Sequence, residues 1–248
     1  MKLPSRDQMV MGLRAIRELL LHAPSRILKI YTVKPSGERK SETLALCQEK
    51  GIAISFTSDS ELTKMTGSDS HQSFVAHVKG RQFFDPRQFF KKIGDQERVI
   101  VLMVDQIFDP ANLGALMRCA ECLGASGIIW SKNRGCDLTP AAAKASCGAS
   151  ELLPLIRVSN LADTAEQFKK EGFEVVASLL DPQAQSAFRF AFSPRTLLIV
   201  GSEGEGIQPL LQKKSDRLIY IPMAGHIDSL NVAQAAAILL SRYMAGDL

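Results

Sequence analysis

Long apolar runs, signal-like segments and repeats are all missing from this sequence of 248 residues. No stretch approaches the roughly 18 consecutive apolar residues that a membrane-spanning helix needs, and residues 1–10 carry charges where a secretory signal would have an apolar core. Hydrophobic residues make up 46% of the chain and charged residues 23%, values that are typical of folded globular proteins. These features exclude fibrous and disordered classes, and we expect a soluble, cytoplasmic protein with no membrane partner.

Cysteines are sparse and odd in number, which argues against a disulfide framework and for a reducing compartment. Cys119 and Cys122 form a C-x-x-C pattern, but no second pair follows at the spacing of a zinc ribbon. We therefore expect both to be small core residues of a helix rather than metal ligands or a redox pair.

Length and charge both indicate two parts of different character. A chain of 248 residues exceeds the roughly 100 to 150 residues of a typical domain, so two domains are expected. Residues 1–97 contain 16 Lys and Arg against 11 Asp and Glu, whereas residues 98–248 contain 14 against 15. The basic first part suits a phosphate-rich partner, although on charge alone an ordinary solvated surface fits as well.

The patterning of residues 1–80 predicts a small α/β domain. Helical segments are predicted at 11–21 and 42–50, and strands at 27–33, 52–56 and 73–78. Residues 81–97 are polar and charged with paired phenylalanines, and we expect a linker there that carries one short helix.

From residue 98 to 248, near-continuous apolar strands alternate with helical segments. The predicted strands are 99–104, 127–130, 155–158, 174–179, 196–200 and 218–221. Such runs indicate a mainly parallel sheet with helices on both faces, so the second domain is predicted to be an α/β sandwich. Ligands of open α/β sheets bind beyond the carboxyl ends of the strands, so the segments after Val104, Val200 and Ile221 are the first places to search for chemistry.

The first of these segments predicts a helix that Asp109 caps and that runs to about Leu123. Arg118 lies off its apolar stripe, and the small residues Gly114 and Ala115 beside it leave room for a ligand or another backbone. Arg118 is therefore a candidate anion contact, and a solvated surface arginine is the alternative.

The second segment is rich in glycine and acidic residues. Glycines at 201, 204 and 206 predict a tight turn where a ligand approaches the backbone, but the spacing is neither G-x-G-x-x-G nor that of a P-loop. Glu203 and Glu205 would repel a pyrophosphate, whereas carboxylates can accept hydrogen bonds from ribose hydroxyls and tolerate a cationic ligand. A nucleoside-like cofactor without phosphates fits this loop, and a purely structural turn is the alternative.

The third segment leads from Ile221 into an alanine-rich helix that Asp228 or Ser229 can cap. Capping alone would explain Ser229, yet the polar approach through 222–228 is longer than a cap requires. The flat face of the helix favours close packing, either within the chain or across a dimer.

Together the three segments resemble the motifs of the SpoU/TrmH branch of the SPOUT methyltransferases. The matching stretches are D-P-x-N-L-G-A-x-x-R at 109–118, G-S-E-G-E-G at 201–206 and I-P-M-x-G-x-x-x-S-L-N-V at 221–232. Upstream, residues 11–20 and 71–76 look like the substrate-binding domain of the bacterial large-subunit (23S) rRNA guanosine 2′-O-methyltransferases. The resemblance therefore covers nearly the whole chain.

This resemblance implies methyl transfer from S-adenosylmethionine to a ribose 2′-hydroxyl of RNA, with no metal ion required. It also implies a trefoil knot in the C-terminal domain, residues 98–248, and a homodimer formed through that domain. Carried over by motif, the cofactor would contact the backbone of Gly201, Ile221 and Leu230. The polar active-site positions are Asn112, Arg118, Glu203, Ser229 and Asn231.

Within this resemblance, Arg118 needs its own chemical argument. Its guanidinium stays protonated far above neutral pH, so we expect it to orient the ribose hydroxyl or a nearby phosphate and to stabilise developing negative charge, not to act as the base. Asn112, Ser229 and Asn231 would hold ribose and cofactor, and Glu203 would position one of these donors.

Three other functions stay open from the sequence. A tRNA 2′-O-methyltransferase is the nearest, although the extra N-terminal domain fits an rRNA enzyme better. A non-catalytic RNA-binding protein would explain the basic first part but not the polar residues of all three segments. A dinucleotide oxidoreductase is disfavoured by the acidic residues of the glycine-rich loop.

Overall fold

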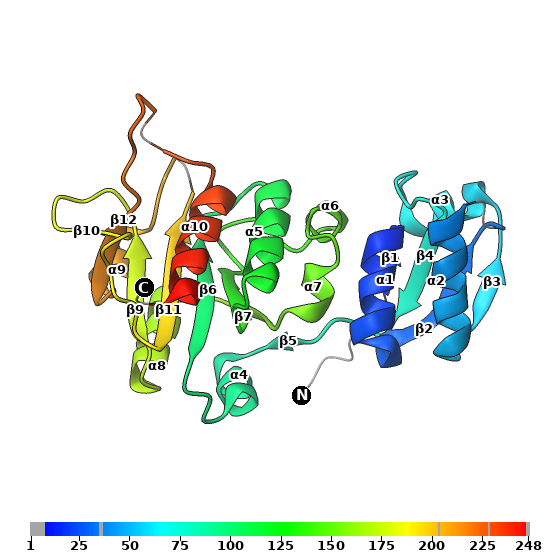
Figure 1. Ribbon diagram of the computed structural model, residues 1–248, viewed down its shortest axis with the longest axis horizontal. Helices are drawn as coiled ribbons and strands as arrows, with labels where there is room; N and C mark the ends of the chain where they lie inside the picture. Colours follow the sequence, from blue (N-terminus) through cyan, green and yellow to red (C-terminus); the bar gives the residue numbers. More distant parts are fainter. Residues whose placement is uncertain (1–7, 35–36, 203, 228, 247–248) are drawn as a thin grey trace. The chain divides into compact units, whose positions relative to one another are not determined.

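The computed structural model describes residues 8–34, 37–202, 204–227 and 229–246, and the contacts within it divide the chain into two units (Figure 1). The first unit comprises Met1–Gln82 together with Cys147–Leu152, and the second comprises Phe83–Ser146 and Leu153–Leu248. Each unit is built on a sheet of its own.

The first unit is a four-stranded sheet with two longer helices packed on one face. Its strands are β1 (Gln8–Met11), β2 (Ile27–Thr32), β3 (Ile54–Phe56) and β4 (Phe74–Val78). They lie in the order β1-β4-β2-β3, where β4 is antiparallel to both neighbours and β3 is parallel to β2. Alternate strand residues such as Ile30 and Ala76 form one core with residues of α1 (Leu13–His22) and α2 (Glu38–Glu49). The helices and strands predicted in this part are confirmed.

Between residues 8 and 82, the strand β1 and the helix α3 (Asp59–Thr66) lie where no strand or α-helix was predicted. The start of α3 carries a capping box, in which the Ser58 hydroxyl accepts from the Glu61 backbone and the Glu61 carboxylate accepts from the Ser58 backbone. The S-x-x-E pattern that forms it is readable in the sequence. A short 3₁₀ turn, Pro24–Arg26, leads into β2.

The short helix α7 (Ala149–Leu152) belongs to the first unit by its contacts, although it lies far along the chain. The Glu151 side chain is only 1% exposed and forms ion pairs with Arg26, at 2.9 Å, and with Arg81. Arg26 Nη1 also donates to the backbone carbonyl of Glu151 at 3.2 Å. Because a buried carboxylate needs compensating charge, the two arginines hold this segment on the first unit.

The second unit is an eight-stranded parallel sheet. Its strands are β5 (Phe83–Phe84), β6 (Val99–Asp105), β7 (Gly127–Ser131), β8 (Leu155–Val158), β9 (Glu174–Ser178), β10 (Gln185–Ser186), β11 (Arg195–Gly201) and β12 (Arg217–Tyr220). Their order is β10-β12-β9-β11-β6-β7-β8-β5, and every pairing between neighbours is parallel. The predicted α/β class is confirmed, and each of the six predicted strands matches an observed strand to within one residue at either end.

Helices cover both faces of this sheet. One face packs against α4 (Pro86–Ile93), α8 (Leu161–Lys170) and α9 (Pro209–Lys213), whose buried residues share a core with Val99, Val101 and Met103 of β6. The other face carries α5 (Pro110–Cys122) and α10 (Val232–Ala245), which lie alongside one another in Figure 1, with α6 (Pro140–Ala145) beside α5. Burial on both faces explains why the strands are almost continuously apolar.

The segment expected to be a linker, 81–97, is part of the second unit from Phe83 onward. β5 pairs with β8, and α4 begins at a capping box formed by Asp85 and Gln88. The paired phenylalanines explain the difference, because Phe89 is fully buried and stacks on Phe168, and Phe90 packs edge-on against the same ring. The expected short helix is present as α4.

In the part of the chain that the structure describes, none of the helices combines the length and the apolar character that crossing a membrane requires.

Candidate active site at the carboxyl edge of the parallel sheet

The three motif segments start from one edge of the parallel sheet. β6 and β11 are neighbours, and their last residues, Asp105 and Gly201, are paired in register. β9 lies on the other side of β11, and β12 lies beside β9. All these strands run in the same direction, as the parallel arrows of β9 and β11 illustrate in Figure 1. The loops that follow β6, β11 and β12 therefore leave the sheet at the same edge.

A hydrogen bond joins the first motif to the third. The Nδ2 atom of Asn231 donates to Oδ1 of Asn112 at 2.9 Å, across 119 positions of sequence. Asn112 lies in the first turn of α5, which Asp109 caps by accepting from the backbone N–H of Ala111 at 2.9 Å. The predicted cap and extent of α5 are confirmed, and two of the five polar positions are in direct contact.

The cap of α10 differs from the prediction. Asn231 is the N-cap, and its Oδ1 accepts from the backbone N–H of Ala233 at 3.0 Å. Ser229 lies two residues too early to cap the helix and is exposed, while Asp228, the other predicted cap, lies outside the described residues. Asn231 therefore serves twice, because its amide oxygen caps α10 while its amide nitrogen reaches Asn112.

The glycine-rich loop doubles back over its own start. A Cβ atom on Gly201 would lie 2.3 Å from the carbonyl carbon of Gly206 and 2.6 Å from the nitrogen of Ile207, so only glycine fits there. The backbone N–H of Gly206 donates to the Ser202 carbonyl at 3.0 Å, and Gly206 has a φ of 66°. The loop is therefore a closed backbone turn at the end of β11, as predicted.

The other predicted site residues of the second and third motifs lie in the loops that follow β11 and β12. Glu203 lies outside the described residues, and Glu205 is exposed, with its backbone N–H donating to the Ser202 hydroxyl at 3.2 Å. Ile221 directly follows β12 and is buried, whereas Leu230 is half-buried just before α10. Gly201, Ile221 and Leu230 thus all lie in the loops of the same sheet edge.

Arg118 lies apart from the Asn112–Asn231 pair within the chain. It is exposed and follows Asn112 by six residues on α5, which corresponds to about 9 Å along the helix axis. It borders a depression of about 370 Å³ that Ala115, Cys119, Cys122, Leu123 and Ala145 also line. Arg118 lies off the apolar stripe, as predicted, and of the two small residues beside it only Ala115 borders this depression, because the backbone of α6 fills the room at Gly114.

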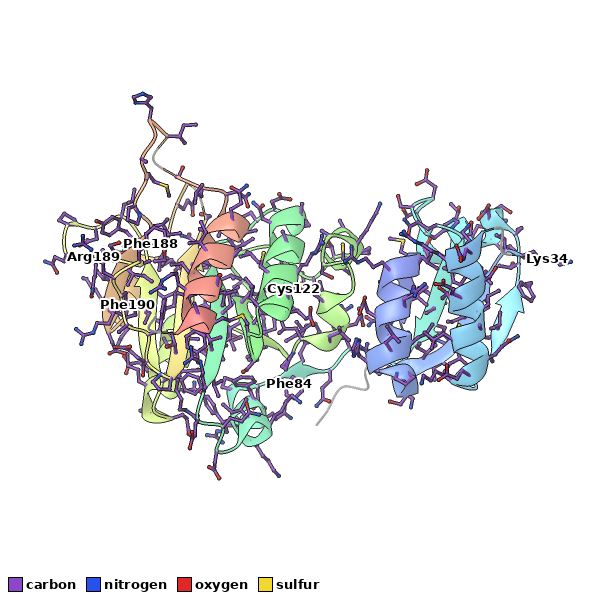
Figure 2. All side chains as sticks on the ribbon, in the orientation of Figure 1. Lys34, Phe84, Cys122, Phe188, Arg189 and Phe190 are labelled. Atoms are coloured by element: carbon purple, nitrogen blue, oxygen red, sulfur yellow. The ribbon has the colours of Figure 1, made fainter. Side chains whose placement is uncertain are left out.

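The two cysteines beside Arg118 lie on α5, where Figure 2 labels Cys122. Burial raises the pKa of the Cys119 thiol, and the nearby Cys122 raises it further, while Arg118 acts to lower it. The thiol form therefore dominates at neutral pH, which agrees with a packing role for Cys119. Cys122 is exposed, so the expectation that both cysteines belong to the core is wrong for this one.

A polar network beside the glycine-rich loop was not predicted from the sequence. Asp105 is fully buried at the end of β6, where its two oxygens accept from the backbone N–H and the side-chain amide of Gln208, at 2.8 and 2.7 Å. Arg134 donates in turn to Oε1 of Gln208. A polar residue ending an apolar strand was the available signal, but its partner, 103 positions away, could not be read from spacing.

A depression that follows the end of β9 was also not predicted from the sequence. Leu180, Asp181 and Pro182 border a depression of about 340 Å³ together with Tyr220, the last residue of β12. Phe188 is 52% exposed in the loop after β10, where Figure 2 labels it beside Arg189 and Phe190. Exposed apolar side chains in loops carry no periodic signal, so only their position after parallel strands could have drawn attention to them.

The parallel sheet, with a glycine-rich loop and paired amides at the carboxyl ends of its strands, defines an open α/β protein, a class in which ligands bind at that edge of the sheet. The chain belongs to the SpoU rRNA methylase family, because the model of that family matches residues 99–241. A second family description, RNA 2′-O ribose methyltransferase substrate binding, matches residues 9–84.

Relatives of known name are similar over nearly the whole chain. A protein named 23S rRNA (guanosine-2′-O-)-methyltransferase RlmB from Acinetobacter baylyi is 33% identical over 92% of this chain and 93% of its own length. The protein of the same name from Escherichia coli is 32% identical over 94% of this chain and 96% of its own. A solved structure of an AdoMet-bound rRNA methyltransferase from Sinorhizobium meliloti has a TM-score of 0.76 at 25% identity, covering 98% of this chain and 88% of that one.

Proposed function

We propose that this chain transfers a methyl group from S-adenosylmethionine to a ribose 2′-hydroxyl of RNA, and that the acceptor is a guanosine of 23S rRNA. The observation that carries the proposal is the 2.9 Å hydrogen bond between Asn112 and Asn231, which joins two of the three motifs at the sheet edge. The family match supports the reaction, and the names of the relatives support the substrate.

The loops of this edge fit the cofactor. Gly201 has no side chain, so a ligand at the end of β11 would meet its backbone, and the glycine-rich loop offers no lysine to hold a phosphate. We assign cofactor contacts to the backbone of Gly201, Ile221 and Leu230. When bound, S-adenosylmethionine supplies the electrophilic methyl group, and no metal ion is required.

The polar side chains then hold and orient the acceptor. Asn112 and Asn231 are already fixed by their mutual hydrogen bond, and we assign them, with Ser229, to the ribose and cofactor. Glu203 would position one of these donors. Orientation of this kind matters because methyl transfer requires the ribose oxygen to lie in line with the sulfonium methyl.

Arg118 would orient the 2′-hydroxyl or an adjacent phosphate and stabilise negative charge as the proton leaves. We also propose a homodimer formed through the C-terminal domain and a trefoil knot within it, both of which the motif resemblance implies. A cytoplasmic location follows from an rRNA substrate.

A methyl-transfer assay tests this function. Purified protein is incubated with S-adenosylmethionine labelled in the methyl group and with unmodified 23S rRNA or tRNA transcripts, and ribose methylation is mapped by resistance to alkaline cleavage. We expect one guanosine of 23S rRNA to be methylated. Labelling of tRNA instead would overturn the substrate assignment, and RNA binding without cofactor binding would overturn the enzyme.

A further inference from the structure

Asp105 ends β6 as a fully buried carboxylate that both donors of one residue satisfy. Its Oδ2 accepts from the backbone N–H of Gln208 at 2.8 Å, and its Oδ1 accepts from Nε2 of the same residue at 2.7 Å. Hydrogen bonds to an ionised acceptor are the stronger kind, and a buried acceptor without partners is costly. This pair therefore fixes the position of Gln208 against the sheet.

Arg134 determines which way the Gln208 amide points. Its guanidinium donates to Oε1 of Gln208, so the amide nitrogen must face Asp105. Arg134 follows β7, where its backbone N–H donates to the Ser131 hydroxyl at 3.2 Å. The three side chains thus connect the ends of the neighbouring strands β6 and β7 with the residue that precedes α9, where the glycine-rich loop ends.

The glycine-rich loop lies between two fixed points as a result. Gly201 is held at one end by its pairing with Asp105 in the sheet, and Gln208 is held at the other end by the Asp105 side chain. Gln106, whose φ of 57° is unusual for a residue other than glycine, adds a hydrogen bond from Nε2 to the Gly206 carbonyl at 3.3 Å. Such strain is retained where the surrounding structure demands a particular backbone geometry.

We propose that Asp105, Gln208 and Arg134 are positioning residues for the cofactor, which they serve by fixing the backbone of Gly201 and Gly206, at the start and the end of the glycine-rich turn. They act through the loop, and none of them touches the reacting atoms. The inference rests on the proposed function, because it takes the ligand of this loop to be S-adenosylmethionine. It assigns the network to cofactor affinity more than to the rate of the chemical step.

Exchanging the two polar groups gives the sharpest test. In Asp105→Asn, one donor of Gln208 faces the N–H of an amide in place of a carboxylate oxygen. We expect the dissociation constant for S-adenosylmethionine to rise about tenfold, because that factor corresponds to the loss of one charge-assisted hydrogen bond. In the double variant Asp105→Asn with Gln208→Glu, the new amide can donate to the new carboxylate, which also accepts from Arg134. We expect this exchange to restore most of the affinity, a result that a merely structural role for residue volume would not produce.

Two further variants keep the test decisive if Asp105→Asn folds poorly. Arg134→Ala removes an exposed side chain, so the fold should persist while the amide of Gln208 loses its orientation and cofactor affinity falls several-fold. Asp216→Asn is the matched control, because Asp216 also accepts a backbone N–H, from Val175 at 2.9 Å, but at the opposite edge of the sheet. It should leave the affinity unchanged.

Calorimetry with S-adenosylmethionine alone gives the affinities, and steady-state kinetics give KM for the cofactor and kcat. We expect KM to rise while kcat at saturating cofactor changes by less than about threefold. If the unaltered protein does not bind the cofactor, the proposed function is overturned and this inference with it. If it binds and both Asp105→Asn and Arg134→Ala bind equally tightly, only the positioning role is overturned.

Discussion

Among the residues that the structure describes, each unit buries one carboxylate almost completely, and the two are satisfied in opposite ways. In the first unit, Glu151 is 1% exposed and meets two guanidinium groups, those of Arg26 and Arg81. In the second unit, Asp105 is fully buried, and both of its oxygens accept from the uncharged Gln208. One carboxylate is held by opposite charge and the other by neutral donors of fixed direction.

The difference indicates what each carboxylate is for. Charge attraction tolerates small changes of geometry, so the Glu151 triad is suited to holding a chain segment in place. Neutral donors require alignment, so the Asp105 network is suited to defining the position of a loop. We therefore expect changes in the first unit to affect stability and changes at the sheet edge to affect cofactor binding and methyl transfer.

The largest expected effect is on the stability of the first unit. Glu151→Ala leaves two arginines without their buried partner, and we expect the free energy of unfolding to fall by about 3 to 5 kcal/mol. Chemical denaturation measures the loss, and calorimetry with S-adenosylmethionine on the folded fraction should give the affinity of the unaltered protein. A loss of stability below about 1 kcal/mol, or a large loss of affinity, would break the contrast between the two carboxylates.

The next effect concerns Arg118 in the second unit. In Arg118→Lys the charge persists but the planar fork of donors is lost, so we expect turnover on RNA to fall about a hundredfold at neutral pH with little change in stability. Arg217→Lys is the matched control, because Arg217 is the first residue of β12, at the end of the strand opposite the motif loops, where it pairs with Glu174 at 3.3 Å. Near-normal turnover of the Arg118 variant would rule out a demand for bidentate orientation.

The smallest effect is a pH dependence of the first unit. Burial raises the pKa of the Cys47 thiol to about 11 from the model-compound value of 9.0. Because the folded value is the higher one, this stability is fully present below pH 9 and is lost as the pH rises towards 11. We expect unfolding free energy to fall by about 1 kcal/mol between pH 8 and 10, and Cys47→Ala to weaken that dependence. An unchanged slope in the variant would assign the loss to other groups.

The sheet of the second unit could be predicted from sequence because burial on both faces leaves long apolar runs. The start of α5 could also be predicted, because Asp109 is a good N-cap residue and proline, here Pro110, is favoured at the first position of a helix. The cap of α10 was harder, because Asp228, Ser229 and Asn231 are all good capping residues and only the three-dimensional position of Asn112 distinguishes Asn231.

What could not be predicted depends on contacts between distant positions. Nothing local to Gln208 reveals that it faces Asp105, and nothing local to Glu151 reveals that it belongs with Arg26 in the first unit. The motifs did locate the sheet edge. The hydrogen bond between Asn112 and Asn231, which turns two motifs into one site, required the fold.

The helix α5 carries a glycine in its middle where an alanine would be intrinsically more stable by about 1 kcal/mol. A Cβ atom on Gly114 would lie 2.4 Å from the carbonyl oxygen of Ala142 and 2.5 Å from Cβ of Ala145, so α6 rests directly on the backbone of α5. Gly114 stands between Asn112 and Arg118 on the same helix. Because Gly114 has no side chain, α6 can pack this closely on α5, and this packing sets the position of α5. The position of α5 in turn determines where Asn112 and Arg118 present their side chains.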